Sequence, residues 1–175
     1  AWRVMCAARI TARRRQKLTH LLSEEDRRSF GQNGYIERRD FLPAEEFRRL
    51  VGEVETLAAP SREMMEGGTI TRRMALSPGV LRDRPAIRAF LRNPGWSDAV
   101  RYVGGFDVEP VMTIQAIVAT PPRTPRDRDP QTNLHMDTFH STVKAWFFLH
   151  DVREEEGPLR YIAGSHKLTR RRLAW

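Results

Sequence analysis

The sequence has a single cysteine, Cys6, so it can form neither an intramolecular disulfide nor a cysteine-based zinc cluster. It also lacks any apolar run near the roughly 18 residues that a membrane-spanning helix needs. The first ten residues mix arginines with apolar residues and hold no continuous signal-peptide core. The scarcity of cysteine is typical of a reducing compartment, and we predict a cytoplasmic protein without a membrane span.

Lysine is scarce as well: the chain has 27 arginines and three lysines, with a formal net charge of +8. Such a charge can attract nucleic acid. The arginines are, however, spread along the whole chain, and the clusters Arg13–Arg15 and Arg170–Arg172 carry no interleaved aromatic residues that could stack on bases. We therefore do not expect nucleic-acid binding, and we keep it as a third hypothesis only.

The length of 175 residues suits one domain, which we place at residues 1–175. Its first part, about 20–105, carries helix signals. Ser23 followed by three acidic residues predicts the start of a helix that ends at Gly34. Pro43 predicts the start of another helix with one apolar stripe. The other segments predicted in this part are an extended stretch at 35–41 and helices at 83–91, stopped by Pro94-Gly95, and at 97–103.

The second part, about 108–175, carries strand signals. Residues 111–120 are rich in β-branched side chains and predict a buried strand. Residues 121–130 hold four prolines and predict a loop. Further strands are expected at 132–138, at 141–152 with both faces largely buried, and at 159–163. Helices first and short strands later predict an α+β fold with a sandwich or barrel core.

His135-Met136-Asp137 is a pair of metal-ligand types two positions apart. On a strand, such residues point to the same face, so an imidazole and a carboxylate could reach one metal ion. They would supply two of the three ligands of a two-histidine, one-carboxylate facial triad. With five histidines and 22 acids, roughly 0.6 such matches are expected by chance, so the alternative is a surface histidine beside an acid.

Several motifs accompany this pair in a fixed order. They are Phe30–Ile36 and Asp40-Phe41-Leu42 near the start, and Trp146, Asp151-Val152, Gly157-Pro158-Leu159 and Gly164-Ser165-His166-Lys167 after the pair. With these motifs the chain resembles the bacterial branch of the phytanoyl-CoA dioxygenase family, over residues 30–47 and 134–175. The middle of the chain is only compatible with that family.

The resemblance implies a double-stranded β-helix, a jelly-roll or cupin-like core with helices packed outside. It implies Fe(II) held by His135, Asp137 and a second histidine, with 2-oxoglutarate as co-substrate. The implied activity is a dioxygenase that uses O2 to hydroxylate a small-molecule or lipid-like substrate and converts 2-oxoglutarate to succinate and CO2. The carboxylate at Asp137 argues against the related halogenases, which have a small residue there.

The sequence departs from the family in one respect. In the family, the second histidine and an arginine for 2-oxoglutarate lie tens of residues beyond the glycine-serine-histidine motif, whereas this sequence ends nine residues after His166. His140 and His150 are too close to the His135–Asp137 pair to match that histidine. We therefore expect an incomplete β-core whose exposed strand edges invite self-association. The alternative function is a catalytically incomplete member that binds a ligand or partner without turnover.

Four further residues are candidates for binding 2-oxoglutarate. Trp146 matches a family tryptophan that lines the co-substrate pocket, and the alternative is a core aromatic. Lys144 shares its strand face with Trp146 and could hold a carboxylate as a point charge, the alternative being a solvent-exposed lysine. Thr138 and Gln115 could donate hydrogen bonds to the co-substrate, although both residue types are equally common in ordinary sheets.

Overall fold

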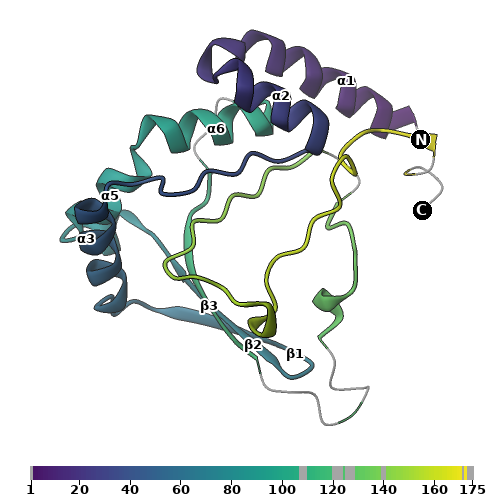
Figure 1. Ribbon diagram of the computed structural model, residues 1–175. Coiled ribbons are helices and arrows are strands. Elements are labelled where there is room, and N and C mark those ends of the chain that lie inside the picture. The colour runs from purple at the N-terminus through teal and green to yellow at the C-terminus, as the bar shows by residue number, and fades with distance from the viewer. Residues whose placement is uncertain are drawn as a thin grey trace. The chain divides into compact units, whose positions relative to one another are not determined.

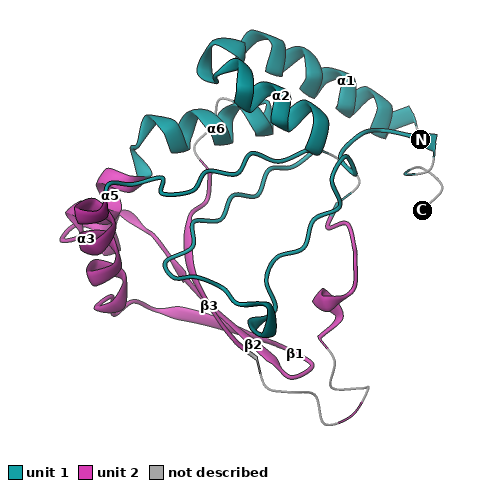
Figure 2. Cartoon of the chain, in the orientation of Figure 1, with its two compact units in different colours: residues 1–43, 91–108, 138–175 teal, residues 44–90, 109–137 magenta. Residues whose placement is uncertain are grey.

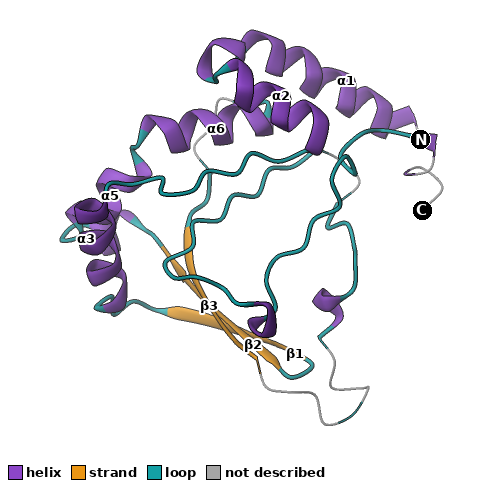
Figure 3. Ribbon diagram, viewed as in Figure 1, coloured by secondary structure: helices purple, strands orange, loops and turns teal. Residues whose placement is uncertain are grey.

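The computed structural model describes residues 2–106, 110–119, 124, 129–138, 141–170 and 172. The chain divides into two compact units (Figure 2): unit 1 comprises residues 1–43, 91–108 and 138–175, and unit 2 comprises 44–90 and 109–137. The strands, drawn in orange in Figure 3, belong to unit 2, and the regular structure described in unit 1 is helical. None of the helices in the described residues has the length and hydrophobicity of a membrane span.

Among the described residues, unit 1 contains the helices α1 (Trp2–Lys17), α2 (Glu24–Asn33) and α6 (Pro94–Gly104), with the short 3-10 turn η1 (Thr19–Leu21) after α1 (Figure 1). Their core contains Leu22, Phe30 and Tyr102, all less than 9% exposed. The Phe30 and Tyr102 rings pack edge to face, with centroids 6.0 Å apart and planes at 80°. Four partly buried residues surround this cluster: Leu18, Ile36, Ala99 and Val103.

The ends of α2 follow from its sequence as predicted. The Ser23 hydroxyl accepts a hydrogen bond from the Asp26 amide at 3.1 Å, and Gly34 ends the helix in the left-handed conformation, with φ of 91°. The prediction at Pro94 was wrong in part. Pro94 lies in the first turn of α6 and begins that helix rather than only stopping the preceding one, because the preceding Asn93 side chain caps the Trp96 amide.

The helices of unit 2 are α3 (Ala44–Glu55), α4 (Pro78–Leu81) and α5 (Pro85–Leu91). The start of α3 directly after Pro43 and the presence of α5 confirm two predictions. Leu50 of α3 and Ile87 and Phe90 of α5 are buried. The Glu53 carboxylate accepts hydrogen bonds from the Ala86 and Ile87 amides, both at 2.9 Å, and so caps α5 from α3.

Unit 2 also holds one antiparallel sheet of three strands in the order β1-β2-β3: β1 (Ser61–Glu66), β2 (Thr69–Ala75) and β3 (Thr113–Ala119). The strand predicted at 111–120 is confirmed, but its predicted burial is wrong, since Ile117 and Val118 are 62% and 57% exposed. The β1–β2 hairpin, which turns at Gly67-Gly68, was not predicted. Its arginines and glutamates interrupt the apolar alternation that identifies a half-buried strand.

The strands predicted at 132–138, 141–152 and 159–163 are wrong, because the described residues there pair with no neighbouring strand. The regular structure that is described between residues 130 and 163 is limited to two 3-10 turns, η3 (Pro130–Thr132) and η4 (Glu154–Glu156). Trp146 and Phe148 are 48% and 52% exposed, which also contradicts the predicted burial of both faces. Residues 35–41, for which an extended stretch was predicted, do not pair with any strand of the described structure. The described residues thus combine helices with a small antiparallel sheet, and they do not form a complete double-stranded β-helix.

Candidate metal centre

The segment that carries His135 and Asp137 begins at a small capped turn in unit 2. The Asp129 carboxylate accepts a hydrogen bond from the Gln131 amide at 2.8 Å and thereby fixes the start of η3. Asn133 ends that turn in an extended conformation, with φ of −81° and ψ of 145°. The following residues continue without a strand partner among the described residues. The pair therefore lies on a loop and not on the strand that we predicted.

His135 and Asp137 nevertheless converge. His135 Nε2 lies 3.4 Å from Asp137 Oδ1, and the two side chains are 42% and 41% exposed. His135 Nδ1 lies 2.7 Å from the backbone oxygen of Asn133. A backbone carbonyl can only accept, so Nδ1 carries the proton in this contact, and Nε2 is the ring nitrogen that faces Asp137.

This arrangement fits two ligands of one metal ion. Two donors at about 2.1 Å from an ion, in adjacent octahedral positions, lie about 3.0 Å apart, close to the observed 3.4 Å between Nε2 and Oδ1. A histidine ligand usually donates its other ring N–H to a carbonyl or carboxylate, as His135 does to Asn133. Within the described part of the chain, no third histidine, cysteine or acid joins them in a cluster. His135 and Asp137 therefore suit two ligand positions of a metal ion.

Gln115 lies on β3 of the same unit. It stands opposite Arg73 of β2 in the sheet register, and Arg73 Nε donates a hydrogen bond to Gln115 Oε1 at 3.1 Å. The amide oxygen is thus engaged by a guanidinium, which orients the amide nitrogen of Gln115 as a donor. Gln115 is exposed in this position. Its role as a ligand of 2-oxoglutarate stays a prediction.

The other three candidates for binding 2-oxoglutarate belong to unit 1. Thr138 is half-buried, and Lys144 and Trp146 are exposed. Lys144 and Trp146 lie two positions apart on a segment, 141–148, that has no regular secondary structure. The lysine ammonium is therefore held by no strand ladder, and its assignment to a carboxylate stays a prediction, as do those of Thr138 and Trp146.

The remaining histidines differ in their exposure to solvent. His20 and His150 are exposed, His140 lies outside the described residues, and His166 is half-buried in the turn that follows Gly164. The His166 ring packs on Phe30 with centroids 5.4 Å apart, and its Nδ1 is buried with no hydrogen-bond partner among the residues that the structure describes. Burial lowers the pKa of His166, and the charges of Lys167, Arg15 and Arg172 lower it further. These effects favour the neutral form of the His166 imidazole.

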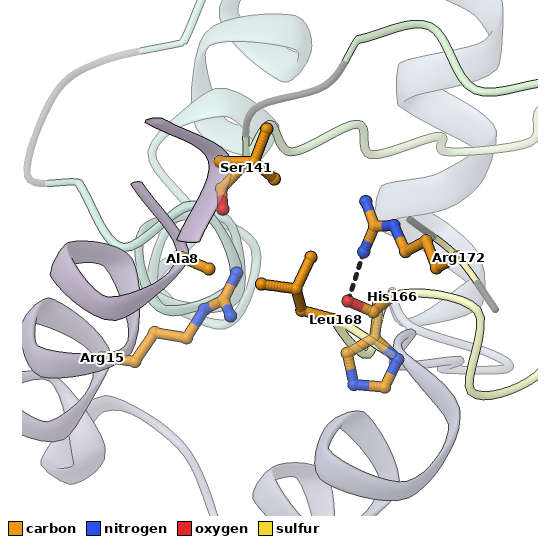
Figure 4. Close-up of a pocket in the computed structure, with 7 residues that line it drawn as sticks. Ala8, Arg15, Ser141, His166, Leu168 and Arg172 are labelled. Atoms are coloured by element: carbon orange, nitrogen blue, oxygen red, sulfur yellow. Dashed lines mark hydrogen bonds between the residues drawn. The ribbon is translucent and has the colours of Figure 1, made fainter. Parts of the chain in front are cut away.

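Sequence reasoning missed a cavity beside this histidine. It lies in unit 1 and is lined by Val4, Ala8, Arg15, Ser141, His166, Leu168 and Arg172. Figure 4 shows the guanidinium groups of Arg15 and Arg172 on either side of the Leu168 side chain. No local sequence pattern predicts this cavity, because Arg15 and Arg172 come from opposite ends of the chain. Each of them belongs to an ordinary cluster of basic residues.

Comparison with protein-family models gives a match to phytanoyl-CoA dioxygenase (PhyH) over residues 30–175. Comparison with curated proteins and with solved structures gives no match. The matched region includes the His135–Asp137 pair and every motif from which the resemblance was drawn. It leaves α1 and η1 outside. The chain therefore belongs to the phytanoyl-CoA dioxygenase family, a family of oxygenases.

Proposed function

We propose that this chain is an Fe(II)- and 2-oxoglutarate-dependent dioxygenase that hydroxylates a small-molecule or lipid-like substrate. The observation that carries the proposal is the convergence of His135 Nε2 and Asp137 Oδ1 at 3.4 Å in a chain of the oxygenase family. Imidazole and carboxylate ligands with open positions beside them suit non-haem Fe(II).

In this proposal the two ligand side chains are already positioned for the ion before it binds. The contact of His135 Nδ1 with the Asn133 carbonyl would hold the proton on Nδ1 and so leave Nε2 available as the ligand of the ion. Asp137 supplies negative charge beside that lone pair, which favours a cation. Both side chains remain more than one-third exposed, so the ion, a keto acid and O2 can reach them. The bound Fe(II) and 2-oxoglutarate would supply the oxidising power for hydroxylation, with release of succinate and CO2.

The proposed contacts with 2-oxoglutarate use residues of complementary chemistry. Lys144 would hold a carboxylate by charge, and Thr138 and Gln115 would donate hydrogen bonds. Trp146 would cover the co-substrate with an apolar ring whose exposed fraction is 48%. In this proposal residues 1–175 act on a small-molecule substrate and O2.

The proposal is tested by measuring succinate formed from 2-oxoglutarate in the presence of Fe(II), ascorbate and a panel of candidate substrates. The parent chain is expected to form succinate in an iron-dependent way. His135→Ala and Asp137→Ala are expected to lower the rate at least 100-fold, because each removes a metal ligand.

Two matched variants control for the loss of any histidine or any acid. His150→Ala and Asp151→Ala alter exposed residues of the same chemical types outside the pair, and both are expected to keep the parent rate. Equal loss in these controls, or full activity in Asp137→Ala, would contradict the proposal. Circular dichroism of each variant establishes that it is folded.

The second candidate function is a family member that binds a ligand without turnover. The favouring observation is that, among the described residues, the His135–Asp137 pair gains no third histidine, cysteine or acid. This reading predicts a folded chain whose thermal stability does not change when Fe(II) is added or removed by a chelator. An iron-dependent rise in the unfolding temperature would exclude it.

A further inference from the structure

We propose that the cavity between α1 and the Gly164–Arg172 segment of unit 1 binds a short-chain monocarboxylate. The cavity has a volume of about 100 Å³ and an amphiphilic lining. It uses α1, which lies outside the region matched by the family model. The inference concerns a second site and does not depend on the proposed iron chemistry.

Two guanidinium groups supply the positive charge of this cavity. Arg15 is held by hydrogen bonds from Nε and Nη2 to the Val103 carbonyl, and its guanidinium lies over the Phe30 ring at 4.7 Å from the centroid. These contacts fix the group while leaving Nη1 out of the Val103 interaction. Arg172 Nη1 donates a hydrogen bond to the His166 carbonyl, drawn as a dashed line in Figure 4. Both cations are thus positioned by neutral groups.

The charge of these arginines is not compensated by the cavity itself, because none of its lining residues is acidic. Burial lowers the pKa of Arg15, an effect that the nearby Tyr102 partly opposes. A guanidinium that has lost water, and whose hydrogen bonds within the described residues go to a carbonyl and not to an acid, gains free energy from a bound anion. An anion is therefore the ligand that this lining recognises.

The remaining lining residues select among anions. Val4, Ala8 and Leu168 add apolar surface, which fully hydrated inorganic anions do not match. The cavity volume of about 100 Å³ is well above the roughly 10–15 Å³ that one water molecule requires, so the cavity has room for a ligand of several non-hydrogen atoms. A planar carboxylate with a short alkyl chain places its oxygens at the guanidinium groups and its carbons at the apolar wall.

The test is calorimetric titration of the full chain with sodium propionate, against sodium chloride at the same ionic strength. We expect saturable binding of one propionate per chain with a millimolar Kd. Arg172→Gln removes one cation and is expected to weaken binding at least tenfold. Arg170→Gln removes an exposed arginine that does not line the cavity, and its Kd is expected to stay within twofold of the parent value.

A second variant keeps the test decisive if Arg172→Gln alters folding. Ala8→Leu adds volume at the cavity wall without changing charge, so it is expected to abolish propionate binding at an unchanged circular dichroism spectrum. Inorganic phosphate is titrated in parallel and is expected to bind at least tenfold more weakly than propionate. Absence of saturable propionate binding, equal weakening by Arg170→Gln, or tighter binding of phosphate would overturn the assignment.

Discussion

At the scale of single residues, the Glu53 carboxylate joins two helices of unit 2. It accepts hydrogen bonds from the Ala86 and Ile87 amides, and Ile87 is the most completely buried side chain in the described structure, with 2% of its surface exposed. These amides are unsatisfied helix donors in the absence of Glu53. A charged acceptor at a helix N-terminus also interacts favourably with the helix dipole.

Glu53→Ala is therefore expected to lower the free energy of unfolding by about 1–2 kcal/mol. For a chain of this length, that corresponds to a fall of roughly 2–8 °C in the unfolding temperature. Thermal denaturation followed by circular dichroism measures it. Glu55→Ala, an exposed residue of the same helix, serves as the control and is expected to change stability by less than about 0.5 kcal/mol.

His166 makes stability depend on pH in a defined direction. Burial, Lys167, Arg15 and Arg172 lower its pKa in the folded chain below the 6.5 of the unfolded chain. Between these two pKa values the unfolded state binds more protons than the folded state, so stability rises with pH. The stabilisation is complete above about pH 6.5 and is lost as the pH falls toward the folded-state pKa.

Urea unfolding at a series of pH values from 7.5 to 5 is expected to show this decline in the parent chain. His166→Gln is expected to show a shallower decline, because glutamine does not titrate. His150→Gln, which alters an exposed histidine, is expected to keep the parent slope. An equal slope in the parent and in His166→Gln would contradict the assignment.

The spacing of His135 and Asp137 predicted their convergence correctly but for an incomplete reason. We expected a strand to align them, whereas the side chains meet on a loop that follows the capped turn η3. Residues two positions apart lie close together along the chain, with or without a partner strand. The pair was thus accessible from sequence, and the cavity between Arg15 and Arg172 was not, since its residues come together only through tertiary packing.

At the scale of elements, helix ends were predictable and strand pairing was not. Ser23, Gly34 and Pro43 act through their own backbone neighbours, and each acts as its residue type predicts. A strand requires hydrogen bonds from a distant segment, which composition does not specify. The β-branched segment at 113–119 forms hydrogen bonds with strand β2. The segment at 141–152 pairs with no strand among the described residues.

Gly34 shows how one helix end depends on tertiary packing. Its φ of 91° disfavours any side chain, and an added Cβ would overlap His166 Nδ1 and lie 2.6 Å from Tyr161 Oη. Gly34→Ala is therefore expected to lower the free energy of unfolding by about 2 kcal/mol or more, measured by urea denaturation.

Gly31 provides the matched control within the same helix. An added Cβ at Gly31 would meet nothing within 4 Å. Gly31→Ala is expected to stabilise the chain by up to about 1 kcal/mol through helix propensity. Equal effects of the two substitutions would show that neither the left-handed conformation nor the contact with His166 matters.

At the scale of the whole molecule, the sheet leaves apolar side chains in contact with solvent. Met65, Ile70 and Val118 form one row across its three strands, and Met65 and Val118 are 73% and 57% exposed. β1 and β3 are the outer strands of the described sheet. Exposed apolar rows and outer strands together favour pairing with a second copy of the chain.

We therefore predict concentration-dependent self-association, measured by sedimentation velocity. Val118→Lys places a charge in the row and is expected to shift the distribution toward the monomer. Ile162→Lys alters an equally exposed apolar residue outside the sheet and is expected to leave the distribution unchanged. A strictly monomeric parent at high concentration would contradict the prediction.

The chain belongs to an oxygenase family, and the function proposed for it depends on one chemical claim: that His135 and Asp137 jointly bind Fe(II). Anaerobic calorimetric titration with Fe(II) tests this claim most directly. The parent chain and Asp151→Ala are expected to bind one Fe(II), and Asp137→Ala is expected to bind it at least 100-fold more weakly. Identical Fe(II) affinities for the parent and Asp137→Ala would contradict the claim.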